Sequence, residues 1–176
     1  ARAIIARPGK GLEIQEERVP VSQFLMGPGK TRLSPGELVI GVEFEALGER
    51  QAGAFLKIGR RRSLVMSVVN TAVVVGLRPA SPNDSRVVLD DVRIALGSVA
   101  PTAVRASRAE AFLRGAPADL ETIRRAAAIS ADEVRSRTRR EYRRQVTATL
   151  VERAVSSALR DLGAVSYTHL RAHETV

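Results

Sequence analysis

The first part of the chain carries short apolar segments of the kind that form strands. Valine, isoleucine and other β-branched residues are frequent in them, which is typical of β-sheets. The strand-like segments are residues 1–5, 38–44, 54–57, 67–77 and 87–100. Residues 13–21 are polar with few apolar anchors, so the pattern predicts no element there.

The last part of the chain has a helical pattern. Residues 107–113 predict a short helix, with Ser107 as its cap and Gly115 as its stop. Residues 119–129 predict a second helix, and the segment Ser130–Glu133 supplies acidic residues suited to the start of a third. Apolar residues at four-residue steps mark one face of this long helix: Tyr142, Val146, Leu150, Ala154 and Ala158.

Because the strands precede the helices, the order favours an α+β fold rather than alternating βαβ units. We expect a three-stranded antiparallel sheet with one face covered by a three-helix bundle. The polar, glycine-containing stretch 45–53 is the best candidate boundary, so residues 1–48 and 49–162 are expected to form separate units. Periodicity stops near Leu162 and Gly163, and residues 163–176 are expected to form a tail.

The composition restricts the chemistry that the chain can perform. Hydrophobic residues make up 44% of the 176 residues and aromatic residues only 3%, so the core must be mainly aliphatic. No apolar run is long enough for a membrane span. The absence of cysteine excludes disulfides, thiolate zinc sites and iron–sulfur ligation by this chain.

The final residues, Val165 to Val176, read VSYTHLRAHETV. They resemble a translated sequencing-library adapter, so we expect them to be an artefact rather than part of the protein. Both histidines of the chain, His169 and His173, fall within this tail. A histidine-based site is therefore not expected.

Two short motifs suggest chemistry that their context does not support. Residues 29–31 read Gly-Lys-Thr, but a phosphate-binding loop needs a glycine where Phe24 stands, and a helix should follow. Asp90 and Asp91 are adjacent carboxylates, and neighbouring residues in a strand point to opposite faces, so they cannot easily share a metal ion.

The net charge of +9 leaves a second interpretation open. Arginines at 60–62 and along the last helix could bind nucleic acid, as a basic non-enzymatic module would. The aromatic residues that often stack on bases are scattered, and solvent-facing arginines are the simpler explanation. A structural assembly module is a further alternative.

Three segments carry a resemblance to a known family. They are residues 19–39 (VPVSQFLMGPGKTRLSPGELV), residues 55–72 (FLKIGRRRSLVMSVVNTA), and residues 93–102 (RIALGSVAPT) with the later Tyr142-Arg143-Arg144. Together they resemble the C-terminal portion of the FAD-binding medium subunit of molybdenum hydroxylases, the carbon monoxide dehydrogenase and xanthine dehydrogenase family. The resemblance covers nearly all of the chain before the tail.

The resemblance implies an oxidoreductase subunit that carries FAD and passes electrons from iron–sulfur clusters to NAD, a quinone or oxygen. The molybdenum cofactor would lie on a large partner subunit and the 2Fe-2S clusters on a small one, in a cytoplasmic dimer of heterotrimers without nucleic acid. No glycine-rich pyrophosphate loop occurs here, so most of the FAD site would lie in sequence upstream of residue 1, and the chain alone would be inactive.

The resemblance also implies three cofactor-binding residues. Met66 falls where the family has an apolar residue against the isoalloxazine ring, and methionine is flexible and polarizable enough for this contact. Lys57 aligns with a basic residue on the flavin side, and a further contact, often basic in the family, falls near Asp90. By residue type alone, Met66 is equally well a core residue and Lys57 a surface lysine.

In the same interpretation, residues 1–48 are the remnant of an α+β FAD-binding domain. Residues 49–162 are then the C-terminal domain of the flavoprotein. The remnant would be poorly stabilised on its own, and exposed Leu38, Ile40 and Val42 would mark a lost interface.

Overall fold

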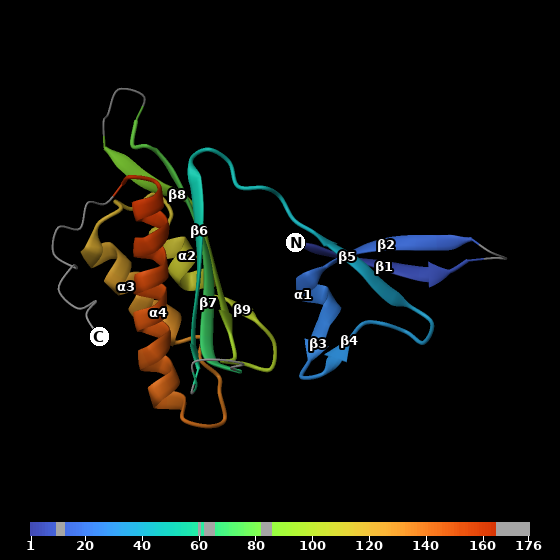
Figure 1. Cartoon of the computed structure of the whole chain (residues 1–176). Coiled ribbons are helices and arrows are strands. Elements are labelled where there is room, and N and C mark those ends of the chain that lie inside the picture. The colour runs from blue at the N-terminus through green and yellow to red at the C-terminus, as the bar shows by residue number, and fades with distance from the viewer. Residues whose placement is uncertain (10–12, 60, 62–65, 82–85, 165–176) are drawn as a thin grey trace. The chain divides into compact units, whose positions relative to one another are not determined.

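A computed structural model describes residues 1–9, 13–59, 61, 66–81 and 86–164, and the adapter-like tail lies outside this part of the chain. The chain forms two compact units (Figure 1). One comprises Ala1–Ala46 with Pro101–Ala103, and the other Leu47–Ala100 with Val104–Val176.

The first unit is built on an antiparallel sheet with the strand order β2-β1-β5. A second small sheet pairs β3 with β4. The elements of the first unit are β1 (Arg2–Pro8), β2 (Ile14–Pro20), α1 (Val21–Phe24), β3 (Leu25–Gly27), β4 (Lys30–Thr31) and β5 (Leu38–Glu43). The strands predicted at the start of the chain and at residues 38–44 are therefore present, as β1 and β5.

Strand β2 arises from a segment in which the pattern predicted no element. Only Val19 of this strand is buried, together with Ala3 and Ile5 of β1. Ion pairs line its polar positions, and Glu17 pairs with both Arg7 and Arg32. Tertiary pairing with β1 thus decides the conformation of a segment whose own apolar pattern is weak.

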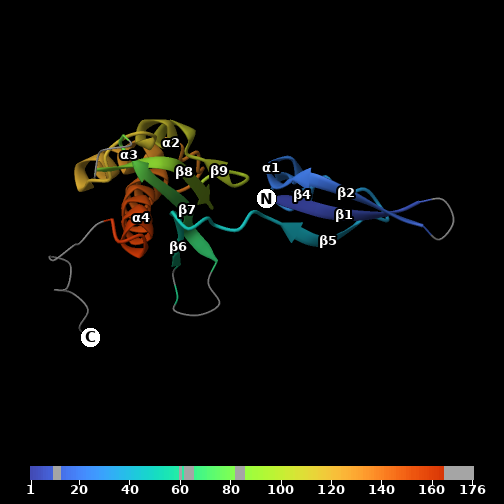
Figure 2. The same cartoon turned by 90° about the horizontal axis from the view of Figure 1, so that it is seen from above.

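The second unit has one antiparallel sheet with the order β6-β7-β8-β9 and three helices. Both views place α2, α3 and α4 on the same face of this sheet (Figures 1 and 2). The elements are β6 (Gln51–Gly59), β7 (Ser67–Pro79), β8 (Val87–Gly97), β9 (Val104–Arg105), α2 (Ser107–Leu113), α3 (Leu120–Ala131) and α4 (Arg140–Asp161). The predicted α+β class is confirmed, and the short strand β9 extends the expected three-stranded sheet.

The core of the second unit lies between the sheet and the helices. Alternate residues of β7 and β8 are buried, as the period of a strand with one covered face requires. Of the predicted helical face, Leu150, Ala154 and Ala158 are buried, whereas Tyr142 near the start of α4 is 47% exposed. The core is aliphatic, as the composition predicts.

Two details of the helix boundaries differ from the predictions. Ser130 does not open the last helix: it is buried near the end of α3, where its hydroxyl donates to Ala126 O at 3.0 Å. Ser107 does not cap α2 either, because it is already the first helical residue. The cap found in α3 is Asp119, whose carboxylate accepts from Thr122 N at 2.8 Å. Gly115 has a φ of +77°, consistent with its predicted role as a stop.

Candidate functional site

The candidate cofactor residues Met66 and Lys57 lie on neighbouring strands of the second unit. Met66 directly precedes β7 and is 88% exposed. Lys57 is exposed on β6, opposite Asn70 of β7. Since Ser67 pairs with Gly59, the antiparallel register brings the two candidates to the same end of the β6–β7 pair. The side chain of Met66 is therefore accessible, as contact with a cofactor requires. It does not lie in the core, which was the alternative.

The side chain of Asn70 lies very close to the backbone of Gly97 on the neighbouring strand β8. A Cβ atom on Gly97 would lie 2.2 Å from Asn70 Oδ1, too close for any other residue without rearrangement. Asn70, Gly97 and Lys57 are cross-strand neighbours. Residues Val69 and Thr71 on either side of Asn70 are buried beneath the helices, so this row faces away from them.

Asp90 lies at the other end of the sheet. It is in β8 near the register Leu77↔Leu89, whereas Met66 precedes the first residue of β7. Ten residues of strand separate Ser67 from Leu77, which corresponds to about 33 Å. The Asp90 carboxylate accepts from Arg78 Nε at 3.1 Å and is 56% exposed. The three candidates thus do not converge on one point.

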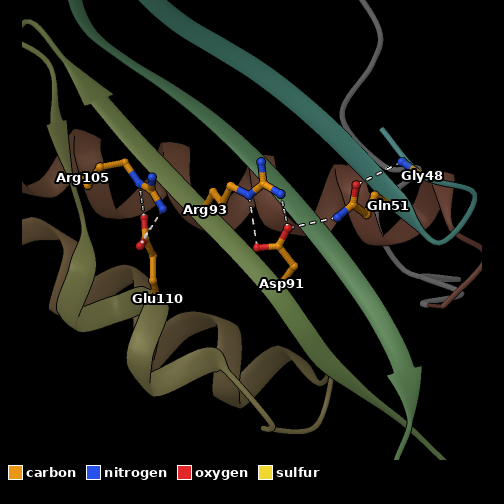
Figure 3. A network of polar contacts seen from close by, with 6 residues as sticks. All are labelled: Gly48, Gln51, Asp91, Arg93, Arg105 and Glu110. Carbon is orange, nitrogen blue, oxygen red and sulfur yellow. Dashed lines mark hydrogen bonds and ion pairs between the residues drawn. The ribbon is translucent and has the colours of Figure 1, made fainter. Parts of the chain in front are cut away.

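Asp91 forms a polar network with Gln51 and Arg93 (Figure 3). Gln51 donates to Asp91 Oδ2 at 3.0 Å and accepts from Gly48 N at 3.0 Å. The guanidinium of Arg93 hydrogen-bonds to both oxygens of Asp91 and holds the pKa of that carboxyl below its ordinary value of about 3.8. The two adjacent carboxylates therefore serve different ion pairs. Within the described ranges, no group of three or more His, Cys, Asp or Glu side chains could hold a metal ion.

The most buried carboxylate of the second unit is Glu110 in α2 (Figure 3). It accepts from Arg105 Nε at 2.6 Å and Nη2 at 2.8 Å, a bidentate geometry. It also accepts from the backbone of Ile94 at 2.8 Å. Glu110 therefore joins α2 to β8 and β9, and its role is structural.

The arginines of α4 are distributed between the sheet and the surface. Arg143 donates from Nη1 to the carbonyl oxygens of Val68 and Ser98. Arg144 pairs with Asp132 at 2.7 Å. These contacts explain two arginines of the Tyr-Arg-Arg segment without nucleic acid. Of the arginines at 60–62, two lie outside the described residues.

The sequence interpretation missed the roles of Arg143 and Glu110. Arg143 was expected mainly on the solvent side, yet it stands four residues before Thr147, which is buried on the helix. The helical period therefore contained the signal that Arg143 begins the buried face. Glu110 had no comparable signal, because a helical glutamate is usually exposed and its burial depends on how α2 packs on β8 and β9.

The segment Gly29-Lys30-Thr31 occupies a hairpin rather than a phosphate-binding loop. Lys30 and Thr31 form β4, which pairs with β3, and the next regular element is strand β5. No helix N-terminus follows this glycine within the described residues of the first unit. The fold therefore also argues against a phosphate-binding loop at this segment.

An α+β unit with an antiparallel sheet covered on one face by three helices matches a known domain class. Residues 54–158 match the family described as the CO dehydrogenase flavoprotein C-terminal domain. The match covers more than half of the chain, so the chain belongs to this family.

Individual relatives agree with the family match. The xanthine dehydrogenase FAD-binding subunit of Escherichia coli O157:H7 is 26% identical over 161 residues, covering 86% of this chain and 53% of that protein. The xanthine dehydrogenase of Emericella nidulans is 32% identical over 114 residues, covering 61% of this chain and 8% of that protein. The likeness to FAD-binding subunits confirms the family that the sequence motifs indicated.

Solved structures show the same fold. A carbon monoxide dehydrogenase from Hydrogenophaga pseudoflava superimposes with a TM-score of 0.73 at 25% identity, covering 90% of this chain and 53% of that one. The quinoline 2-oxidoreductase of Pseudomonas putida 86 gives a TM-score of 0.72 at 23% identity, covering 93% and 54%. The chain spans about half the length of these relatives. In its described part, no helix is both long and apolar enough to cross a membrane.

Proposed function

We propose that the chain is part of the flavoprotein subunit of a molybdenum hydroxylase, which relays electrons from iron–sulfur clusters through FAD to NAD, a quinone or oxygen. The proposal rests on the family match over residues 54–158 and on one structural observation. Met66, the residue that the resemblance assigns to the flavin, directly precedes β7 and is 88% exposed. A large apolar side chain so exposed next to a strand is available for a cofactor or a partner surface.

The residues present fit one edge of a flavin rather than a whole FAD site. Met66 offers a polarizable thioether to an aromatic ring, a contact that contributes about 0.3–1.5 kcal/mol. Lys57 offers an exposed ammonium group on the adjacent strand. No glycine-rich loop for the pyrophosphate occurs in the sequence, so the remaining contacts belong to other residues of the subunit.

Each of the two residues has a distinct role in this proposal. FAD, when bound, accepts and releases the electrons. Met66 packs against the isoalloxazine ring and excludes water from it. Lys57 places a positive charge near the ring, which favours the electron-rich reduced cofactor and raises its reduction potential. Asp90 remains a predicted contact, separate from these two because of its place at the other end of the sheet.

The rest of the proposal follows the same family. Residues 1–48 would be the end of the FAD-binding domain and residues 49–162 the C-terminal domain. A large molybdenum-binding subunit and a small 2Fe-2S subunit would be the partners, in a cytoplasmic dimer of heterotrimers. Purification of the complex and analysis of its molybdenum, iron and flavin content would test this composition.

The flavin contact is tested in the full-length subunit with Met66→Ala and Lys57→Met. We expect Met66→Ala to weaken FAD binding by about 2- to 10-fold, from the energy of a methionine–aromatic contact. We expect Lys57→Met to lower the flavin midpoint potential because a positive charge is lost. The dissociation constant is measured from recovery of flavin fluorescence, and the potential by spectroelectrochemistry.

The chain offers matched controls for both substitutions. Met26, the other methionine, is 69% exposed in the first unit, and Lys30 is exposed on β4. Met26→Ala and Lys30→Met should leave both flavin properties unchanged. If Met66→Ala behaves like Met26→Ala, Met66 does not contact the flavin. Asp90→Asn, measured in parallel, tests the third predicted contact.

A further inference from the structure

The start of β7, which directly follows Met66, is attached to helix α4 by the side chain of Arg143. Arg143 of α4 donates from Nη1 to the carbonyl oxygen of Val68 and to that of Ser98. Val68 lies two residues after Met66. Ser98 directly follows β8 and has a φ of +62°, unusual for a residue other than glycine. The guanidinium thus bridges two segments that meet at this end of the sheet.

Val68 has no paired residue on either neighbouring strand. On one side, Ile58 pairs with Val69 and Gly59 with Ser67, so a bulge leaves Val68 without a partner on β6. On the other side, pairing with β8 begins only at Asn70. Val68 is therefore not a paired position in either ladder, and its carbonyl oxygen accepts a hydrogen bond from Arg143.

The second acceptor of Arg143, Ser98, lies in a segment that is anchored in the core. Val99, next to Ser98, is fully buried, and its carbonyl accepts from the backbone of Arg135 at 2.9 Å. Gly97, on the other side of Ser98, is in close contact with the Asn70 side chain. Arg143 therefore connects the irregular start of β7 to the segment after β8, which Val99 anchors in the core.

Arginine suits this position better than any neutral residue. Its planar group presents several N–H donors in fixed directions and can serve two carbonyls at once. Within the described part of the chain, Arg143 Nε is buried without a hydrogen-bond partner, so part of the charged group is removed from water. Burial of this kind costs free energy, which the hydrogen bonds from Nη1 to the two carbonyl oxygens help to offset.

We propose that Arg143 is a positioning residue that holds the start of β7 so that Met66 stays in place against the flavin. This inference rests on the proposed flavin contact of Met66. Arg143 acts through Val68 and does not itself touch the cofactor. Without the bridge, the bulged segment before Val69 loses its anchor, and Met66 samples positions in which it does not pack against the ring.

The experiment uses the full-length, FAD-containing subunit with Arg143→Met, Arg143→Lys, Met66→Ala and the double variant Arg143→Met/Met66→Ala. Arg153→Met is the matched control, because Arg153 is an exposed arginine of the same helix. FAD affinity, the flavin absorbance spectrum and the thermal unfolding midpoint are measured for each. Arg143→Lys keeps the positive charge and N–H donors but loses the planar guanidinium geometry, so it provides a folded variant if Arg143→Met does not fold.

We expect Arg143→Met to weaken FAD binding by about 2- to 10-fold, the same range as Met66→Ala, and to shift the flavin spectrum in the same direction. The double variant should lose no more affinity than the stronger single variant, because both changes remove one contact. Arg143→Lys should give an intermediate loss, and Arg153→Met none.

Three results would be decisive against the idea. If Met66→Ala weakens FAD binding but both Arg143 variants match Arg153→Met, the positioning role is wrong and the flavin contact stands. If the Arg143 and Met66 effects simply add, Arg143 acts on stability and not through Met66. If neither Met66→Ala nor Lys57→Met alters the flavin, the proposed contact itself fails, and the inference fails with it.

Discussion

The two units of the chain differ in how far they bury their apolar residues. In the second unit, one core joins the sheet to all three helices, and Leu96, Ile123 and Leu159 are fully buried. In the described part of the first unit, the buried hydrophobic residues are Ala3, Ile5 and Val19. The second unit is thus closed around its own core, whereas the first has little core of its own.

The apolar residues of the first unit are instead found at its surface. Leu38, Ile40 and Val42 of β5 are 65%, 50% and 57% exposed, and Phe44 just beyond is 77% exposed. β5 is also an edge strand of its sheet. An exposed apolar edge of this kind is a site for pairing or for burial against other protein. The proposal that residues 1–48 belong to a larger FAD-binding domain remains a prediction, and such a domain would cover this edge.

The largest expected effect is the loss of a core side chain in the second unit. Leu96→Ala should destabilise the protein by about 2–5 kcal/mol, because it leaves a cavity beneath the helices. Leu38→Ala makes the same chemical change in the first unit, but its effect should stay within about 0.5 kcal/mol because Leu38 is already exposed. Urea denaturation followed by circular dichroism measures both. Equal losses would contradict the contrast between the units.

A smaller loss is expected for the buried carboxylate that joins α2 to the sheet. Glu110→Gln should cost about 1–3 kcal/mol, since the charge-assisted pair with Arg105 is lost in a largely buried site. Glu152→Gln is the matched control, because Glu152 pairs with Arg124 at the surface and should contribute less than about 1 kcal/mol. If the two variants unfold at the same urea concentration, the Glu110 hydrogen bonds do not contribute to holding α2 on the sheet.

The network around Asp91 predicts a pH dependence of the second unit. Because Arg93 lowers the pKa of Asp91 in the folded protein, the ionised carboxylate stabilises the fold above about pH 3.8. This contribution is lost as the pH falls through the lowered pKa. Unfolding of the natural chain and of Asp91→Asn, measured between pH 6 and pH 2, should therefore differ at the upper end and converge at the lower.

Substitution of Arg93 sharpens this pH test. Arg93→Met removes the main cause of the lowered pKa, so the folded and unfolded pKa values of Asp91 approach each other and less stability should be lost between pH 6 and pH 2 than in the natural chain. A pH profile that is the same in Asp91→Asn and the natural chain would exclude Asp91 as its origin.

The smallest change in stability is expected at the exposed edge of the first unit. The double variant Ile40→Thr/Val42→Thr should alter the free energy of unfolding by less than about 0.5 kcal/mol, since both side chains are at least half exposed. It should nevertheless bind less of the dye ANS and aggregate less, because apolar surface is removed. Val87→Thr in the second unit, 41% exposed, is the comparison and should change dye binding less.

Much of the second unit could be predicted from local patterns. The predicted segment 107–113 coincides with α2, and 67–77 lies within β7, because strand and helix periods are local properties of the sequence. Strand β2 was missed since Glu16 and Glu17 make it polar, and it depends on pairing with β1. The start of α4 was misplaced because Asp132 and Glu133, which resemble a helix start, follow the end of α3 instead.

The candidate site could be predicted only in part. The resemblance named Met66 and Lys57, and antiparallel pairing brings them to one end of the β6–β7 pair. Arg143 could be placed on the buried side of its helix from the period, but its partners could not be identified. Val68 and Ser98 lie 75 and 45 residues away from it, and no local pattern relates such positions.

The sequence by itself determined the class of fold, the aliphatic core and the family, because these depend on periodicity, composition and motifs that local segments carry. The tertiary structure decided which residues meet. A single bulge between Ile58 and Gly59 removes Val68 from the ladder and turns its carbonyl into a partner for Arg143. Sheet register depends on contacts summed over whole strands, so it is set only when the complete unit has assembled.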